Sequence, residues 1–454
     1  MYKYFANALV VNEGRKEYIN ILTKGNRIEV LSKSSLSDLP FETEYVECSG
    51  LILIPGVIDA HVHFRQPGME YKADMSSESK AAIAGGVTTV LEMPNTKPST
   101  TNIECLEDKL RLAKENMYCN YGFFFGLTNE NYEAAKEISA NKCCGLKLFL
   151  GSSTGNMLVN EQKTLENIFS ITDKVISAHC EDEDTIRENT IKYKALYNDK
   201  ATASIHPLIR SSEACFKSSS FAVSMAEKHG AHLHIAHLTT EKEISLLHSG
   251  DISEKRITSE VSPIHLWFEI GDFAEYGNLI KCNPSIKTKE DRTALRRALR
   301  EDKIDIIATD HAPHTWEEKQ KPYFDAPSGM PSIQHSLLLI LQLVEQGELT
   351  LEKMVEKMAH NPAKLFGIKD RGYIKEGYFA DFVLINPNKK TIVTKDSLQS
   401  KCKWSPFEGK TFDNKIVATY LNGEKVFEND TVFDRRNAMM IEKVEKKLRK
   451  DLVD

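Results

Sequence analysis

The feature that most constrains the fold is a repeated alternation between short apolar runs and longer helical stretches. Runs rich in β-branched and aromatic residues recur about eight times between residues 51 and 314. This rhythm is typical of a parallel sheet whose strands are joined by crossover helices. Eight units over roughly 300 residues match a closed barrel better than an open doubly wound sheet. The sequence therefore predicts an α/β protein built on a (β/α)8 TIM-like barrel.

The eight expected strands can be read directly from the sequence. They lie in LILIPGVIDAHVHF (51–64), GGVTTVLEMPN (85–95), CNYGFFFGLT (119–128), CCGLKLFLGSS (143–153), DKVISAHCED (173–182), AHLHIAHLTT (231–240), KRITSEVSPIHL (255–266) and KIDIIATDHAPH (303–314). Neither a G-x-G-x-x-G string nor a Walker A string follows any of them, so we expect no nucleotide cofactor.

Both ends of the chain have a different character from the middle. Residues 1–54 and 371–433 contain short β-rich runs separated by turns, including an Asn-Gly hairpin signal at Asn422–Gly423. We therefore predict a small β-sandwich domain built from residues 1–54 and 371–433. The barrel is expected to occupy residues 55–370.

The last segment, residues 434–454, is highly charged but carries one apolar stripe. Ile441, Val444, Leu448 and Leu452 are spaced by three and four residues, which is typical of a helix. We predict a helical tail that packs on its own domain or on a second subunit. Contact with a membrane or an acidic partner is the alternative.

The charge balance and the apolar runs exclude several classes of partner. Fifty-nine basic and 65 acidic side chains give a net charge of −6, which does not favour nucleic-acid binding. No apolar run reaches the roughly 18 residues of a membrane span, and the N-terminus does not resemble a signal peptide. Nine cysteines occur without a C-x-x-C pair, which is typical of reduced thiols. We expect a cytoplasmic protein that acts on a small molecule.

The first barrel strand ends in Asp59-Ala-His61-Val-His63-Phe-Arg65. The period-two alternation of a strand places His61, His63 and Arg65 on one face, where two imidazoles can bind one metal ion. A second H-x-H string, His232-Leu-His234, is an internal control. Its histidines have the opposite strand parity to His237, and we expect them to be structural.

Other strands also end on residues that can bind metal. Lys147, His179, His237 and Asp310 stand at the carboxyl ends of the fourth, fifth, sixth and eighth expected strands. Each alone is more often structural, but barrel enzymes place their chemistry at this end of the strands. The joint pattern therefore predicts a metal site.

Lys147 is the unusual member of this set. Its neighbours are Leu146, Leu148 and Phe149, among which an ammonium is costly and its pKa is lowered. A neutral amine can react with carbon dioxide, and the resulting carbamate can bridge two divalent metals. His61 and His63 would then bind one metal, and His179 and His237 the other. The structural alternative is a lysine paired with a carboxylate on a neighbouring strand.

Five motifs together resemble a known family. They are D-x-H-x-H-F-R-x-P-G from Asp59, G-L-K-L-F from Gly145, A-H-C-E-D from Ala178, I-A-H-L-T-T from Ile235 and T-D-H-A-P-H from Thr309. They resemble the amidohydrolase superfamily and, within it, the long-chain bacterial dihydroorotases. The resemblance covers nearly the whole chain, and HNPAKLFGI (360–368) is similar to the return from such a barrel to its small β domain.

The resemblance implies a binuclear metal centre. It implies two divalent ions, expected to be zinc, and Asp310 as the catalytic base. The implied ligands are His61, His63, carboxylated Lys147, His179, His237 and Asp310. Cys180 or Glu181, beside His179, is expected to support these ligands, and the sequence does not choose between them.

The resemblance also implies contacts to a substrate. Arg65 separates substrates within the superfamily, because a guanidinium matches a carboxylate in a bidentate pair. Asn95 and His314 are the other implied carboxylate contacts, and Asn283 is an implied ring contact. Pro327 and Gly329 are expected to offer backbone groups to the ring amide. Without the resemblance, the alternative interpretation of Asn95 and Asn283 is as turn caps.

The sequence departs from the resemblance only on the substrate side. Many relatives have N-P-P-L-R where this chain has Asn283-Pro-Ser-Ile-Lys287, and P-H-H-L where it has Pro263-Ile-His265-Leu266. They also carry a G-x-E near the segment SGMPSIQHS. These differences concern the shape of the ring pocket and any contact with a partner subunit.

The implied reaction is the reversible cyclisation of N-carbamoyl-L-aspartate to L-dihydroorotate, a step of pyrimidine synthesis. A neighbouring cyclic amide such as allantoin or a hydantoin is the first alternative. A metal-free scaffold, as a structural partner of a transcarbamoylase, is the second. We expect the chain to form a homo-oligomer, a dimer.

Overall fold

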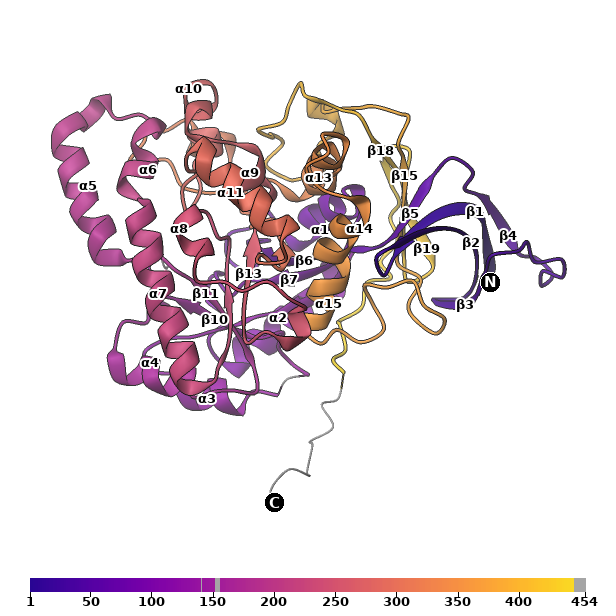
Figure 1. Ribbon diagram of the computed structural model, residues 1–454, viewed down its shortest axis with the longest axis horizontal. Coiled ribbons are helices and arrows are strands. Elements are labelled where there is room, and N and C mark those ends of the chain that lie inside the picture. The colour runs from indigo at the N-terminus through magenta and orange to yellow at the C-terminus, as the bar shows by residue number, and fades with distance from the viewer. Residues whose placement is uncertain (140, 152–155, 445–454) are drawn as a thin grey trace, which may run out of the picture.

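A parallel β-barrel forms the larger part of the computed structural model, which describes residues 1–139, 141–151 and 156–444 (Figure 1). Each of the eight segments expected to form a strand contributes one, and one of these strands is interrupted at Phe124. The strands are β6 (Val57–Val62), β7 (Val87–Glu92), β8 (Asn120–Phe123) with β9 (Phe125–Gly126), β10 (Leu146–Phe149), β11 (Val175–His179), β12 (His232–Ile235), β13 (Ile257–Val261) and β14 (Ile306–Ile307). The predicted (β/α)8 barrel is confirmed.

Backbone hydrogen bonds close the barrel between its first and last strands. β6 pairs with β7 on one side, and on the other side Val62 forms a parallel bridge with His311, just after β14. The His63 N–H donates to the His311 carbonyl at 2.8 Å. The interrupted strand is bonded on both sides, because Phe124 N donates to Glu92 O and Phe125 N donates to Gly145 O.

Helices surround the barrel (Figure 1); α1 to α11 lie between its strands in sequence, and α12 to α15 follow the last strand. They are α1 (Met75–Ala84), α2 (Ile103–Asn116), α3 (Tyr132–Glu137), α4 (Gln162–Phe169), α5 (Glu183–Tyr197), α6 (His206–Ile209), α7 (Ser212–His229), α8 (Glu241–Ile244), α9 (Pro263–Trp267), α10 (Phe273–Tyr276), α11 (Lys289–Arg300), α12 (Trp316–Lys319), α13 (Ser336–Glu345), α14 (Leu351–Val355) and α15 (Asn361–Leu365). Short 3-10 turns lie at Asn198–Lys200, Ala203–Ile205, Ile252–Glu254, Ile270–Asp272, Gly277–Ile280, Ile333–His335 and Lys395–Ser397, and a π-turn at Glu356–His360 joins α14 to α15.

The ends of these helices follow local sequence signals. The Ser211 side chain caps the first turn of α7, and Gly230, with φ of +69°, ends it in the left-handed conformation that favours glycine. Asp74 and Ser77 form a reciprocal capping box at the start of α1. Among the described residues, no helix combines the length and the apolar character needed to cross a bilayer.

Strands from both ends of the chain form one separate sheet. Its members are β1 (Tyr2–Asn12), β2 (Arg15–Lys24), β3 (Arg27–Ser32), β4 (Glu44–Glu47), β5 (Ile52–Pro55), β15 (Phe382–Asn386), β18 (Lys415–Leu421), β19 (Glu424–Glu428) and β20 (Thr431–Val432). The order is β20-β19-β18-β15-β5-β1-β2-β3, with β4 also on β1. β5 and β15 join the two halves as an antiparallel pair. The β-rich unit from both termini is thus present, as one continuous hydrogen-bonded sheet around a core containing Phe5, Phe382 and Tyr420.

The chain passes from this sheet into the barrel at Gly56, between β5 and β6. A Cβ at this position would lie 2.1 Å from Thr88 Oγ1, so only glycine allows the close approach. The largest hydrophobic cluster continues across the crossing, since Ile52 and Val383 from the sheet share it with Val62 and Leu148 from the barrel. The division at residues 54/55 and 370/371 therefore stays a prediction about separable units.

The C-terminal segment differs from its prediction where it is described. Residues 434–444 form no helix; their only regular pairing is two isolated bridges, from Met440 to Tyr121 and from Lys443 to Ile368. Ile441 is buried at 5% exposure whereas Val444 is 59% exposed, so the two do not share one apolar face. Pairing with the barrel and its neighbouring loop replaces helix formation here. Leu448 and Leu452 lie outside the described residues.

Candidate active site

One pocket opens at the carboxyl ends of the barrel strands and has a volume of about 670 Å³. Every predicted metal ligand and substrate contact lines it. These residues are His61, His63, Arg65, Asn95, Lys147, His179, His237, Asn283, Asp310, His314, Pro327 and Gly329. The barrel thus brings together residues that lie up to 268 positions apart in the sequence, from His61 to Gly329.

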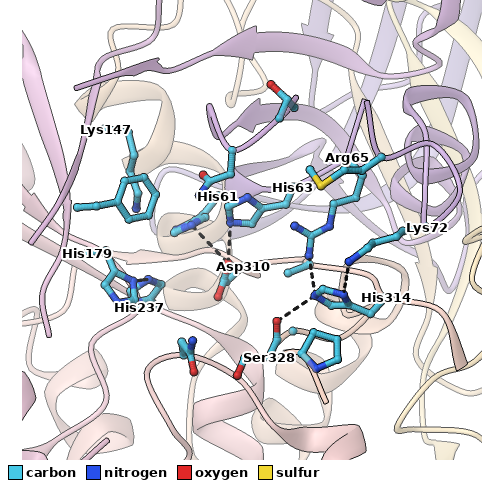
Figure 2. A pocket seen from close by; sticks show the side chains of 18 of the residues that line it. His61, His63, Arg65, Lys72, Lys147, His179, His237, Asp310, His314 and Ser328 are labelled. Atoms are coloured by element: carbon cyan, nitrogen blue, oxygen red, sulfur yellow. Dashed lines mark hydrogen bonds and ion pairs between the residues drawn. The ribbon is translucent and has the colours of Figure 1, made fainter. Parts of the chain in front are cut away.

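Two histidines and one aspartate meet at the centre of the pocket. The Nε2 atoms of His61 and His63 lie 3.4 and 3.1 Å from one Asp310 carboxylate oxygen (Figure 2). The three ligand atoms all lie within 4.8 Å of one another, which is the separation that binding to a single metal ion requires. Burial lowers the pKa of His63 to about 3, so its imidazole is neutral at neutral pH and its lone pair is available.

A second pair of imidazoles converges beside this cluster. His179 Nδ1 and His237 Nε2 lie 3.0 Å apart, and burial lowers the pKa of both rings. The other nitrogen of His179, Nε2, is 2.9 Å from the Glu181 carboxylate. Glu181, and not Cys180, is therefore the neighbour that contacts His179; Cys180 donates instead to the backbone oxygen of Ala178.

Lys147 lies near both histidine pairs (Figure 2). Its side chain is fully buried, its Nζ lies 5.2 Å from the centre of the Phe149 ring, and it has no hydrogen-bond partner among the described residues. Burial lowers its pKa to about 8, which raises the fraction of neutral amine. A buried amine without a partner, in the same pocket as two pairs of imidazole ligands, fits a lysine that is modified and shared by two divalent metals.

A buried glutamate that the sequence analysis did not single out lies beneath the cluster. Glu260, on β13, accepts hydrogen bonds from His61 Nδ1 and, at 3.1 Å, from His234 Nε2. Its contact holds the His61 ring with Nε2 directed at Asp310. His234 therefore has the structural place that its strand parity predicts. The signal for Glu260 was a single acidic residue in the otherwise uncharged strand Ile257–Val261.

A cationic group forms the opposite wall of the pocket. Arg65 is 9% exposed; its Nε donates to the Pro313 carbonyl at 3.1 Å, and its Nη2 lies 3.1 Å from His314 Nε2. Lys72 Nζ lies 3.0 Å from the other His314 nitrogen, Nδ1 (Figure 2). Burial lowers the pKa of His314 to about 3, so the ring is neutral and accepts from Lys72. This wall can bind an anionic group of a ligand.

The remaining predicted contacts lie around the rest of the pocket. The Asn95 side-chain oxygen is buried without a partner among the described residues. The Asn283 oxygen lies 3.1 Å from His206 Nε2, which leaves its amide nitrogen for the pocket. Gly329 N–H already donates to the Lys281 carbonyl, so Pro327 and Gly329 can offer carbonyl oxygens but not this N–H group.

Three basic residues at or behind this surface carried no clear sequence signal. Arg210 lines the pocket and pairs with Glu181, and the buried ammonium groups of Lys281 and Lys319 bind backbone carbonyls near the pocket. All three lie in the long connections that follow β11, β13 and β14. Charged residues in such connections are normally interpreted as solvated, and only tertiary packing shows that Lys281 and Lys319 are buried.

Comparisons with known proteins show the family and the fold of the chain. The amidohydrolase family matches residues 52–426. Curated proteins named dihydroorotase from Halobacterium salinarum and Geobacter metallireducens are 33% and 34% identical, over 90% and 92% of this chain and 98% and 96% of their own. The solved structure of an L-hydantoinase (dihydropyrimidinase) from Arthrobacter aurescens superimposes with a TM-score of 0.92 at 24% identity, covering 98% of this chain and 100% of that one, and so shows the shared fold. The two curated relatives are named dihydroorotases, and the chain belongs to the amidohydrolase family.

Proposed function

We propose that this protein is a dihydroorotase, which reversibly cyclises N-carbamoyl-L-aspartate to L-dihydroorotate with loss of water. One observation carries the proposal: the buried Arg65 guanidinium lies in the same pocket as the His61, His63 and Asp310 cluster. Dihydroorotate has a carboxylate beside its ring amide, whereas dihydropyrimidines and simple hydantoins lack it. A guanidinium binds a carboxylate through two parallel hydrogen bonds, so Arg65 favours dihydroorotate over substrates without this group.

The side chains of the chain have distinct tasks in this reaction. Arg65, with Asn95 and His314, binds the substrate carboxylate and orients the ring, while Asn283 and the carbonyls of the 327–329 segment face its amide. Asp310 takes the proton from the attacking water during hydrolysis and returns it to the departing ring nitrogen. Cyclisation follows the same path in reverse. Because the open form has two carboxylates and the ring has one, closure consumes a proton and is favoured as pH falls.

His61, His63, Lys147, His179, His237 and Asp310 would hold two divalent metal ions, which we propose to be zinc, since imidazole and carboxylate ligands suit this ion. The metals would supply a Lewis acid for the ring carbonyl and hydroxide at neutral pH. We further propose that the Lys147 amine reacts with carbon dioxide to form a carbamate and releases one proton. The buried Nζ without a partner supports this modification.

The test of the proposed function compares substrates with and without the carboxylate. Purified protein should hydrolyse dihydroorotate and leave dihydrouracil unchanged in a spectrophotometric assay. Arg65→Ala should lower kcat/KM for dihydroorotate by about 10- to 100-fold, the value of a charge-assisted contact. Arg187→Ala, which removes an exposed arginine on α5, should behave like the parent protein.

Other outcomes would identify the alternatives. Faster turnover of dihydrouracil or a hydantoin than of dihydroorotate would indicate a hydantoinase-type enzyme. Absence of both bound metal and turnover would indicate a scaffold that lacks catalysis. Full activity of Arg65→Ala would contradict the carboxylate contact.

The role of Lys147 has a separate test. Metal-free protein should regain metal faster when bicarbonate is present, because the carbamate supplies a ligand. Lys147→Ala should bind less metal and show no response to bicarbonate, as measured by metal analysis after gel filtration. Equal metal uptake with and without bicarbonate in the parent protein would contradict carboxylation.

We also propose that the chain forms a homodimer and acts in the cytoplasm. All nine cysteines are free thiols, which supports a reducing compartment. Sedimentation at several protein concentrations tests the dimer, and cell fractionation tests the location. A monomer at all concentrations, or the protein in an oxidising compartment, would contradict these proposals.

A further inference from the structure

Two buried lysines contact residues 326–329, the segment we call the 326–329 turn, part of which lines the pocket. Lys319, at the end of α12, is 1% exposed, and Lys281, in the loop before Asn283, is 7% exposed. Neither ammonium has a carboxylate within ion-pair distance among the described residues. A buried charge without a counter-ion is costly unless other polar groups solvate it.

Backbone carbonyls solvate both groups. Lys319 Nζ donates to the carbonyls of Lys281, Pro327 and Gly329 at 3.2, 2.9 and 2.8 Å, which uses all three of its N–H bonds. Lys281 Nζ donates to the carbonyls of Tyr323 and Ala326 at 2.7 and 2.5 Å and lies 4.4 Å from the Tyr323 ring centre. The protein backbone therefore takes the place of counter-ions around both lysines.

These bonds leave the 326–329 turn with little freedom. Its four successive carbonyls each have a side-chain partner: Lys281 for Ala326, Lys319 for Pro327 and Gly329, and His314 for Ser328 at 3.0 Å. The Gly329 N–H donates to the Lys281 carbonyl at 2.8 Å. Gly329 has φ of +128°, and a Cβ there would lie 2.5 Å from the Ala312 carbonyl. A conformation so constrained is held by its surroundings.

The same turn lines the pocket. Pro327, Ser328 and Gly329 face the space that also contains Arg65 and Asp310. A carbonyl oxygen has two lone pairs, so an ammonium can hold one from behind while the other remains for a ligand N–H. His314, which holds Ser328, also contacts Arg65. His314 therefore links the position of the turn to that of Arg65 in the cationic wall of the pocket.

We propose that Lys319 is a positioning residue for the substrate: its ammonium holds the 326–329 turn in the shape that receives the ring amide. The proposal rests on the proposed function for the identity of the ring. Its structural part, the holding of the turn by the ammonium, can be measured without any substrate.

The first experiment compares Lys319→Met with Lys321→Met, which makes the same change at an exposed lysine two residues away. Lys319→Met should raise KM for dihydroorotate by about 10- to 100-fold, the value of charge-assisted hydrogen bonds, with kcat changed less than about threefold. Metal content should stay at the parent value. Lys321→Met should retain the parent KM. A parent KM in Lys319→Met, with the parent protein active, would overturn the proposal and leave the proposed function intact.

Hydrogen exchange supplies a readout that does not depend on the reaction. The Gly329 amide should exchange at least about tenfold faster in Lys319→Met than in the parent protein. The reason is that its acceptor, the Lys281 carbonyl, and its own carbonyl are both bound by the Lys319 ammonium. Exchange in α1 should be unchanged. Equal exchange of the Gly329 amide in both proteins would overturn the proposal even if dihydroorotate is not the substrate.

A third measurement uses the parent protein alone, in case Lys319→Met does not fold. Burial lowers the pKa of Lys319 to about 7 and that of Lys281 to about 8. The charged groups around Lys319 are Lys281 and Arg65, which lower its pKa further, and Glu318 and Cys282, which raise it. Loss of the proton removes a donor, so KM for dihydroorotate hydrolysis and Gly329 exchange, corrected for its intrinsic rate, should both rise above about pH 7. Values that stay flat from pH 6 to 9 would overturn the proposal.

Discussion

Three residues of the pocket adopt a backbone conformation that residues other than glycine rarely occupy. Arg65, His237 and Asp310 have φ values of +69°, +34° and +50°. Each follows a barrel strand, and its side chain lines the pocket. Such a conformation costs about 1–2 kcal/mol per residue and persists only where surrounding contacts hold it. Here the contacts among Arg65, His314 and Pro313 are part of that support.

Glu260 provides a prediction at the scale of one residue. Its carboxylate fixes the orientation of His61, so Glu260→Gln should weaken binding of the metal held by His61 by about 10- to 100-fold. Competition with a chromophoric chelator measures this affinity, and circular dichroism monitors the fold. Glu254→Gln, at an exposed position before the same strand, is the matched control. Equal metal affinity of Glu260→Gln and the parent protein would contradict this role.

At the scale of elements, the segment between β15 and β18 connects the terminal sheet to the pocket. It contains the short pair β16 (Thr391–Ile392) and β17 (Thr411–Phe412) and packs against the barrel side. Ser400 Oγ donates to the Glu78 carboxylate on α1 at 2.6 Å, and Trp404 Nε1 donates to the His314 carbonyl at 2.7 Å. The segment between β15 and β18 therefore supports the cationic wall of the pocket, which contains Arg65, Lys72 and His314.

This connection predicts an effect of a change outside the pocket. Trp404→Phe keeps an aromatic ring but leaves the buried His314 carbonyl without its donor, so KM for dihydroorotate should rise by about 2- to 10-fold with kcat unchanged. Steady-state kinetics measure both constants. Trp316→Phe, at 45% exposure, makes the same change on a neighbouring tryptophan and should retain the parent KM. If the two variants have the same KM, the segment does not support the wall.

At the scale of the whole molecule, the interior contains many histidines that are held neutral. Burial lowers the pKa of His265 and His335 to about 4, and that of His63 and His314 to about 3. An unfolded chain binds protons at these rings below about pH 6.5, whereas the folded chain does not. The contribution of these neutral histidines to the unfolding free energy is therefore fully present above pH 6.5. It is lost as pH falls through the range from 6.5 to about 4.

His335 allows this effect to be measured away from the metal ligands. Its ring contacts Phe407 and Ser405. With its pKa lowered to about 4, we expect it to contribute a loss of about 2 kcal/mol in unfolding free energy between pH 7 and pH 5. Urea unfolding of His335→Leu should show a loss smaller by that amount. His248→Leu, at an exposed position, should show the same loss as the parent protein. An identical pH dependence in His335→Leu and the parent protein would contradict a neutral His335.

The pocket residues show which parts of the site can be predicted from the sequence. His61 and His63 were predictable as a pair because strand parity places them on one face, and parity also separated His234 from His237. The conformation of the 434–444 segment was not predictable. Its apolar spacing is typical of a helix, whereas in the folded protein it forms bridges to Tyr121 and Ile368. The Lys281 and Lys319 contacts escaped prediction because they join loops distant in sequence.

The sequence by itself determined the barrel, its strand order and the residue types that stand at the strand ends, because these depend on local periodicity and on the shared direction of parallel strands. The tertiary structure alone decided which groups hold those residues in place: Glu260 behind His61, Trp404 behind His314 and Lys319 behind the 326–329 turn. These contacts join segments up to 199 positions apart for Glu260 and 90 for Trp404. No local pattern encodes such pairs, since each forms only when the closed barrel brings its loops together.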